Sequence, residues 1–145
     1  MRRYEICGLK DIWLVNGYVE VDTPYGRGVR YVDVVGLHRA IAAAIVDKPG
    51  TLAAEELRFL RKELLLSQKA LAALIGTTDQ ALARWERGLT MVPGSADRLV
   101  RALYREHADG DPRLRQLVEH LNRGDAVEPA PLRFEHRRRG WKAAA

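Results

Sequence analysis

The run of residues 67–88 constrains this chain more than any other part of its sequence. Its spacing predicts two short helices, at 67–75 and 78–87, that cross at a steep angle and are joined by a tight turn. Ala72 is small enough to let the two helices approach each other, and Gly76 can adopt the positive φ that such a turn needs. In the second helix we expect a buried stripe of three residues at positions i, i+4 and i+7: Thr78, Leu82 and Trp85.

The opposite stripe of the second helix carries side chains that can read base pairs: Gln80, Ala83, Arg84 and Arg87. Glutamine can pair with adenine through two hydrogen bonds and arginine with guanine, and each such pair is worth about 1–3 kcal/mol of discrimination. Ala83 would allow close approach or contact a thymine methyl, and Asp79 would accept from a cytosine amino group or repel a wrong base. The stripe therefore predicts that this helix binds in the major groove of double-stranded DNA.

Several residues around the two helices are candidates for contacts with DNA phosphates. Gln68 and Thr77 stand at the predicted helix starts, where side chains and backbone N–H groups can bind phosphate. Lys62, Lys69 and Arg87 are further candidates, and plain surface positions explain them equally well. For Gln80 and Arg84 the alternative is a solvated helix face. Gln80 could also cap the helix, because it stands three residues after Thr77.

Residues 67–90 resemble the helix-turn-helix of the lambdoid phage repressors and the wider XRE family. The matching features are the Ser-Gln start, Ala72, the Gly76-Thr77-Thr78 turn, Leu82 and the run Trp85-Glu86-Arg87-Gly88. The resemblance implies a lambda-repressor-like domain of four or five helices. It also implies that Gln68 binds phosphate, that Arg61 pairs with Glu86, and that the base-facing residues are Thr78, Asp79, Gln80, Ala83 and Arg84. Taken without the resemblance, Arg61 and Glu86 could each lie exposed.

Other segments resemble bacterial XRE-type regulators and, more distantly, MqsA-like type II antitoxins: residues 7–9, 13–18, 36–41, 58–63, 96–104 and 140–141. Those antitoxins carry an N-terminal zinc domain with two cysteine pairs, whereas this chain has one cysteine, Cys7. Zinc binding and toxin neutralisation are therefore not carried over, and the resemblance implies dimeric DNA binding alone.

Residues 1–35 are typical of β-structure. Asn16-Gly17 is a strong signal for a two-residue hairpin turn, and residues 24–28 form a second turn. Together they predict a meander of about three strands, at 12–15, 18–22 and 29–34. Residues 36–46 predict a helix that the run Asp47-Lys48-Pro49-Gly50 ends. We therefore expect a first domain at 1–50, which could also dimerise.

From Thr51, an expected N-cap, the pattern is helical, and Leu57, Leu60 and Leu64 mark one apolar face. Together with a helix near 95–107 this defines a DNA-binding domain at 51–108. A last helix is predicted between an Asp111 N-cap and an exit at Gly124, with Pro112 in its first position. Its apolar stripe is formed by Leu114, Leu117, Val118 and Leu121.

The third expected unit, 109–145, ends in a basic segment. After a linker at 128–131, residues 132–141 partly alternate and are expected to add a strand to the N-terminal sheet. The basic cluster there could bind the DNA backbone or minor groove, or could simply guard the edge of a sheet: Arg133, His136, Arg137, Arg138, Arg139 and Lys142.

Composition narrows the remaining classes of function. The net charge of +5 and the pI of about 9.7 favour an anionic partner. One cysteine excludes an internal disulfide and a CxxC zinc pair, and Cys7 with His38 lacks a third ligand, so we expect no metal and no cofactor. The longest apolar run, 40–46, is too short to cross a membrane, and a cytoplasmic location is expected. The sequence shows neither a nucleophile arrangement nor a phosphate-binding loop, so we do not expect an enzyme.

The sequence thus predicts an α+β protein that is a sequence-specific, homodimeric transcriptional repressor. Its dimer contact is expected at the N-terminal sheet or the helix near 112–123, because two copies would match a pseudo-palindromic operator. Two alternatives stay open. One is an antitoxin-like partner of a toxin with autoregulatory DNA binding, and the other is a regulator that senses a small molecule through its N-terminal domain.

Overall fold

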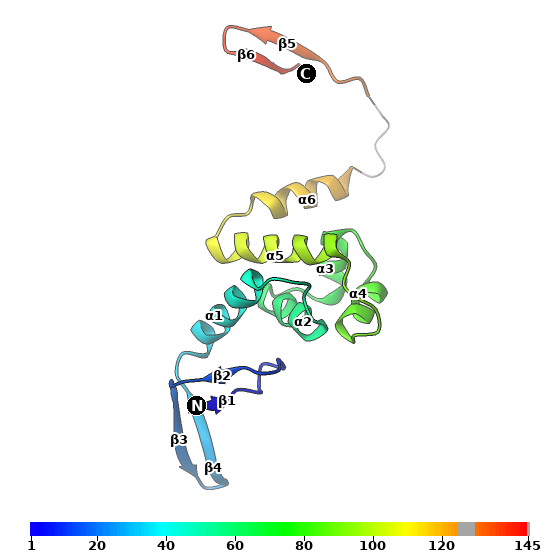
Figure 1. Ribbon diagram of the computed structural model, residues 1–145. Helices are drawn as coiled ribbons and strands as arrows, with labels where there is room; N and C mark the ends of the chain where they lie inside the picture. The colour runs from blue at the N-terminus through cyan, green and yellow to red at the C-terminus, as the bar shows by residue number, and fades with distance from the viewer. Residues whose placement is uncertain (125–129, 145) are drawn as a thin grey trace.

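The computed structural model describes residues 1–124 and 130–144, which form six helices and three two-stranded antiparallel sheets (Figure 1). The expected α+β class is confirmed. The helices are α1 (Val34–Asp47), α2 (Ala54–Glu63), α3 (Gln68–Ile75), α4 (Asp79–Glu86), α5 (Gly94–Asp109) and α6 (Arg113–Arg123). The strands are β1 (Arg2–Arg3), β2 (Trp13–Leu14), β3 (Tyr18–Thr23), β4 (Gly26–Tyr31), β5 (Phe134–Arg137) and β6 (Gly140–Ala143).

Helix α2 lies at the centre of the core. Its Leu57 and Leu60 are fully buried and Leu64, the C-cap that follows it, nearly so, as the predicted apolar face requires. They belong to one buried cluster with Leu71 of α3, Leu82 of α4 and other apolar residues of α1 and α5. Because a buried leucine contributes about 1.5–3 kcal/mol, this cluster holds α3 and α4 firmly against α2.

The helix starts depend on local capping, and those of α1 and α2 differ from expectation. Helix α1 begins at Val34, and the Asp33 carboxylate accepts a hydrogen bond from the Gly36 N–H at 3.0 Å. The prediction that Thr51 caps α2 was wrong. The N-cap is Ala53, whose N–H donates to Glu56 Oε1 at 2.8 Å, because the acidic side chain three residues on satisfies this group without a capping hydroxyl.

The ends of α2, α3, α4 and α5 are each followed by a residue with positive φ. Glycine takes this position after α3, α4 and α5, at Gly76, Gly88 and Gly110, where it costs least. After α2 the residue is Leu65, with φ 60°. The N–H of Leu66 donates to the Arg61 carbonyl at 3.3 Å, so the α2 end has the hydrogen bonding of a Schellman motif.

The N-terminal strands do not form the predicted meander. Strand β2 pairs with β1, in register Arg2 with Leu14, and β3 pairs separately with β4. Asn16-Gly17 therefore does not join paired neighbours in one sheet. The second predicted turn is present, since β3 and β4 are connected at Pro24 and Tyr25. The physical reason is that the two-residue β2 packs its buried Leu14 into the core beside Tyr4 instead of extending the longer ribbon.

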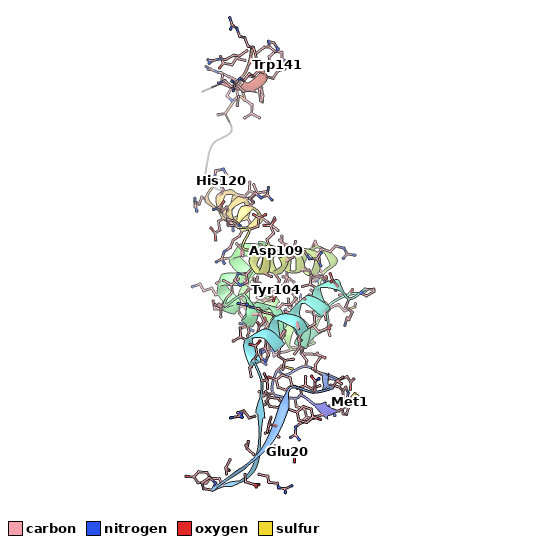
Figure 2. The ribbon with its side chains drawn as sticks, turned by 90° about the vertical axis from the view of Figure 1, so that its left-hand side faces the viewer. Met1, Glu20, Tyr104, Asp109, His120 and Trp141 are labelled. Carbon is pink, nitrogen blue, oxygen red and sulfur yellow. The ribbon has the colours of Figure 1, made fainter. Side chains whose placement is uncertain are left out.

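The C-terminal segment also differs from expectation. Strands β5 and β6 pair with each other, in register His136 with Trp141, and not with the N-terminal strands. Gly140, with φ 107°, allows the chain to reverse after Arg138 and Arg139, so residues 132–141 do not form one strand. The expected linker 128–131 lies partly outside the described residues. Figures 1 and 2 show this ribbon beyond α6, at the opposite end of the molecule from β3 and β4.

Helix α6 lies on α3 and α5, but none of its residues is buried. Its N-cap is Pro112 rather than Asp111, although the Asp111 carboxylate does accept from the Arg113 N–H at 3.1 Å. The predicted Asp111 cap was therefore wrong by one residue. Gly124 ends the helix as expected. Leu117 and Leu121 of its apolar stripe are more than half exposed.

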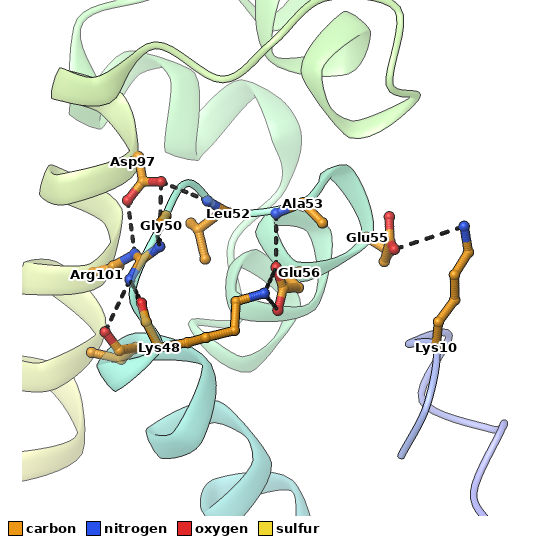
Figure 3. A network of polar contacts seen from close by, with 10 residues as sticks. Lys10, Lys48, Gly50, Leu52, Ala53, Glu55, Glu56, Asp97 and Arg101 are labelled. Carbon is orange, nitrogen blue, oxygen red and sulfur yellow. Dashed lines mark hydrogen bonds and ion pairs between the residues drawn. The ribbon is translucent and has the colours of Figure 1, made fainter.

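The connection between α1 and α2 is fixed to α5 by charged side chains (Figure 3). Asp97 is almost fully buried, accepts from the Leu52 N–H at 2.7 Å and lies 2.7 Å from Arg101 Nε. The Arg101 guanidinium also donates to the carbonyls of Lys48 and Gly50. The predicted division at residue 50 thus falls in a segment that is firmly attached to the helical part, and the division into domains stays a prediction.

In the described part of the chain, the length and apolar character of every helix fall short of what a membrane span requires.

Candidate nucleic-acid interface

Helix α4 turns one side toward the core. Leu82 and Glu86 are buried and Trp85 is half-buried against the core cluster. The prediction that Thr78 joins this buried stripe was wrong. Thr78 is exposed, because it is the N-cap of α4 and its hydroxyl accepts from the Ala81 N–H at 3.1 Å. Ala72 of α3, which was expected to let the two helices approach, is buried.

The outward side of α4 carries the residues that the sequence assigned to base contact. Asp79, Gln80 and Arg84 are exposed with Thr78, and Ala83 is half-buried between them and the core. Because Thr78 is the cap, the alternative capping box from Thr77 to Gln80 is not formed. Within the described residues, the side chains of Gln80 and Arg84 make no hydrogen bond. Both side chains are therefore free to bind a ligand.

Beneath this surface an ion pair connects α2 to α4. Arg61 Nε and Nη2 donate to the two Glu86 carboxylate oxygens at 2.7 and 2.9 Å, in bidentate geometry. The two side chains are only 11% and 2% exposed. Gln68 at the start of α3 donates from Nε2 to Glu86 Oε1 at 3.3 Å. Arg61, Gln68 and Glu86 thus fix the relative positions of α2, α3 and α4.

This geometry gives Gln68 a second role beside the predicted phosphate contact. It is half-buried at the first position of α3, directly after the N-cap Ser67. Lys69 beside it is exposed, and Thr77 is half-buried at the end of the turn before α4. The three residues therefore lie at the N-termini of α3 and α4, where N–H groups without helical partners favour anions.

The two remaining phosphate candidates, Lys62 and Arg87, line the same surface hollow of about 500 Å³. Lys10 and Arg58 line it too, and the sequence interpretation missed both. Arg58 could have been found, since it precedes Lys62 by four residues on α2 and shares its face. Lys10 carried no such signal, because only the fold brings the loop after β1 to α2. Glu55 and Glu86 reduce the positive charge of this hollow.

The ring of His38, which was weighed with Cys7 as a metal ligand, has partners within the protein. His38 Nε2 lies 2.9 Å from the Tyr4 hydroxyl and Nδ1 lies 3.2 Å from Glu63 Oε1, so both ring nitrogens have protein partners. Among the described residues, His, Cys, Asp and Glu nowhere gather in groups of three that could hold a metal ion. The His38 contacts join the N-terminal strands to α1 and α2.

A short helix capped at Thr78, held on its inner side and free on its outer side, follows a first helix through a glycine turn. This arrangement defines the helix-turn-helix class of DNA-binding proteins. Residues 57–95 match the helix-turn-helix family model, which supports an XRE-type helix-turn-helix in this part of the chain. The matched family binds DNA and is not a family of enzymes. No curated protein and no solved structure shows significant similarity to the chain. The resemblance to MqsA-like antitoxins stays a prediction.

Proposed function

We propose that this protein is a dimeric transcriptional repressor, acting in the cytoplasm, that reads a pseudo-palindromic operator in double-stranded DNA with α4. The observation that carries the proposal is the free outer face of α4. Gln80 and Arg84 can pair with base edges there, and the half-buried Ala83 lets the helix approach the groove. Asp79 and Thr78, at the N-terminus of the helix, complete the set of base-facing residues.

Phosphate contacts are proposed around this face. The N-termini of α3 and α4 supply Gln68, Lys69 and Thr77, while Lys62 of α2 and Arg87 after α4 line one surface hollow. Such contacts orient a helix in the groove without reading sequence. Repression then follows from occupation of a promoter.

The direct test is selection of bound sites from a random duplex library, followed by titration of Arg84→Ala. Specific affinity should fall by about 1–3 kcal/mol, because one bidentate pair with guanine is lost. Affinity for a scrambled duplex should not change, and neither should the melting temperature, since the Arg84 side chain is exposed.

Arg87→Ala is the matched control on the same helix end. As a phosphate contact it should lower affinity for the selected and the scrambled duplex by the same factor. If Arg84→Ala lowers affinity for the selected and the scrambled duplex by the same factor, Arg84 is a phosphate contact. Failure to select any preferred sequence would refute the proposed function.

For dimerisation we favour α6 over the N-terminal ribbon. Leu117 and Leu121 are 52% and 59% exposed, although the helix has the period of an amphipathic one. A hollow of about 240 Å³ lies beside the first turn of α6, where Arg115 and the α5–α6 connection meet leucines of the core, and this space supports the view that α6 is loosely packed there. A second copy of α6 would cover the exposed leucines, and would bring two α4 helices to one operator.

Sedimentation equilibrium tests this assignment. Leu117→Glu together with Leu121→Glu should raise the dimer dissociation constant at least about tenfold, equal to about 1.4 kcal/mol. Val19→Glu on the exposed side of β3 is the control, because the N-terminal ribbon is the other candidate contact. If only Val19→Glu separates the protomers, α6 is not the dimer contact.

A further inference from the structure

The positive charge of this protein is concentrated in its C-terminal ribbon. Residues 133–143 contain five Lys or Arg residues and one Glu, a net charge of +4, out of +5 for the whole chain. The other 134 residues together therefore carry a net charge of +1. Neither the fold of the helical part nor the α4 face explains this concentration.

Most of these charges have no acidic partner. Arg137 lies 2.9 Å from Glu135. Within the described part of the chain, the other four make no ion pair: Arg133, Arg138, Arg139 and Lys142. Arg138 and Arg139 form the exposed tip between β5 and β6, and the remaining two flank the ribbon. Because like charges repel, this spacing is stable only in solvent or against an anionic partner.

The ribbon has two different faces. Strand register places Phe134 and His136 on one face with Ala143 and Trp141, and places Lys142 on the other face with Glu135 and Arg137. Figure 2 shows Trp141 far from the helices. A lone two-stranded ribbon is only marginally stable in water, so it is expected to gain order on a binding partner.

We propose that the β5–β6 ribbon is a second DNA-binding element, which contacts the phosphate backbone next to the site read by α4. This inference rests on the proposed function. Ten residues, 124–133, connect α6 to β5, and a chain of this length spans at most about 35 Å. The ribbon can therefore lie up to about this distance from the C-terminal end of α6, which equals the length of about one helical turn of DNA.

The salt dependence of binding tests the proposal. Each phosphate contact by Lys or Arg steepens the slope of log K against log salt by about 0.9. Arg138→Gln with Arg139→Gln should therefore make the slope shallower by about 1.8 on a mixed-sequence duplex of about 40 base pairs, longer than a two-half-site operator.

The matched control is Arg27→Gln with Arg30→Gln in the β3–β4 ribbon. The control variant also loses two positive charges. Because Glu20 and Asp22 balance the arginines of this ribbon, the slope of log K against log salt should be the same as in the wild type. Equal slopes in the tip variant, the control and the wild type would overturn the proposal. An equal effect of the tip variant on binding to single-stranded RNA or to anionic vesicles would also overturn the assignment to duplex DNA.

The two proposals fail in different ways. If the tip variant and the wild type have the same salt slope, while a preferred sequence is still selected and Arg84→Ala still lowers affinity for it, only the ribbon contact is refuted. Absence of any preferred sequence refutes operator recognition by α4, while the slope difference on the mixed-sequence duplex still measures the ribbon. Circular dichroism of each variant should match the wild type, because all four arginines are exposed.

Discussion

Leu65 has a backbone conformation that its side chain disfavours. Its φ of 60° lies in the left-handed region, which disfavours a branched side chain, and the side chain is 86% exposed. The position persists because Leu65 and Leu66 donate to the carbonyls of Lys62 and Arg61 at the end of α2. Since Arg61 also binds Glu86, the turn places α3 relative to the ion pair that supports α4.

Leu65→Gly should therefore stabilise the protein. Glycine removes a cost of about 1–2 kcal/mol in this backbone region and adds about 0.5–1 kcal/mol of chain entropy in the unfolded state. We expect a net gain of up to about 1.5 kcal/mol in the free energy of unfolding, measured by urea denaturation. Leu132→Gly, at an equally exposed leucine with negative φ, is the control and should give no gain. A loss of stability at Leu65 would mean that its side chain packs in solution.

At the scale of elements, the side chain of Asp97 determines how α5 holds the α1–α2 connection. Its carboxylate is buried and binds both the Leu52 N–H and Arg101 (Figure 3). Arg101 in turn reaches the carbonyls of Lys48 and Gly50. Three backbone groups of the connection thus depend on one pair of side chains on α5.

Asp97→Ala should destabilise the protein by about 3–5 kcal/mol, because it leaves a buried guanidinium and the Leu52 N–H without their partner. Asp47→Ala is the control in the same connection. It removes an ion pair with Arg105 in which both side chains are more than half exposed, and should cost at most about 1 kcal/mol. Urea denaturation of both variants measures the difference, and similar losses would contradict the role given to Asp97.

At the scale of the whole molecule, two buried tyrosines determine the response to alkali. Burial, followed by the charges of Cys7 and Tyr31, raises the pKa of Tyr4 above the ordinary 10.0. Burial and then Glu63 raise the pKa of Tyr104, against the opposing effect of Arg39. Because both pKa values are higher in the folded protein, the unfolded chain releases these protons at lower pH.

The free energy of unfolding should consequently be at its full value below pH 10 and fall as pH rises above it. Tyr104→Phe should make this fall less steep, because phenylalanine has no proton to release. The substitution should cost little stability at neutral pH, since the Tyr104 hydroxyl makes no hydrogen bond within the described residues. Tyr25→Phe, at a fully exposed tyrosine, should leave the slope unchanged. Denaturation curves at increasing pH test both, and an identical slope in Tyr104→Phe would contradict the prediction.

The helical part was predictable from sequence because its signals are local. The spacing of Leu57, Leu60 and Leu64 and the glycine at 76 each act within one helix or turn. The pairing of β2 and of the C-terminal strands was not predictable, because Leu14 takes its partner from the first three residues of the chain, and the β5–β6 turn depends on Gly140. The same limit applies to the site, where Lys10 reaches the α2 surface only through the fold.

In the described residues, no strand has a neighbour on both sides, so every strand leaves one row of backbone donors and acceptors open. Such edges are templates for intermolecular strand addition. The β3–β4 ribbon is the longest, its charges cancel, and Tyr25 at its turn is fully exposed. Aggregation in concentrated solution should therefore start on this ribbon, whereas mutual repulsion keeps copies of the arginine-rich one apart.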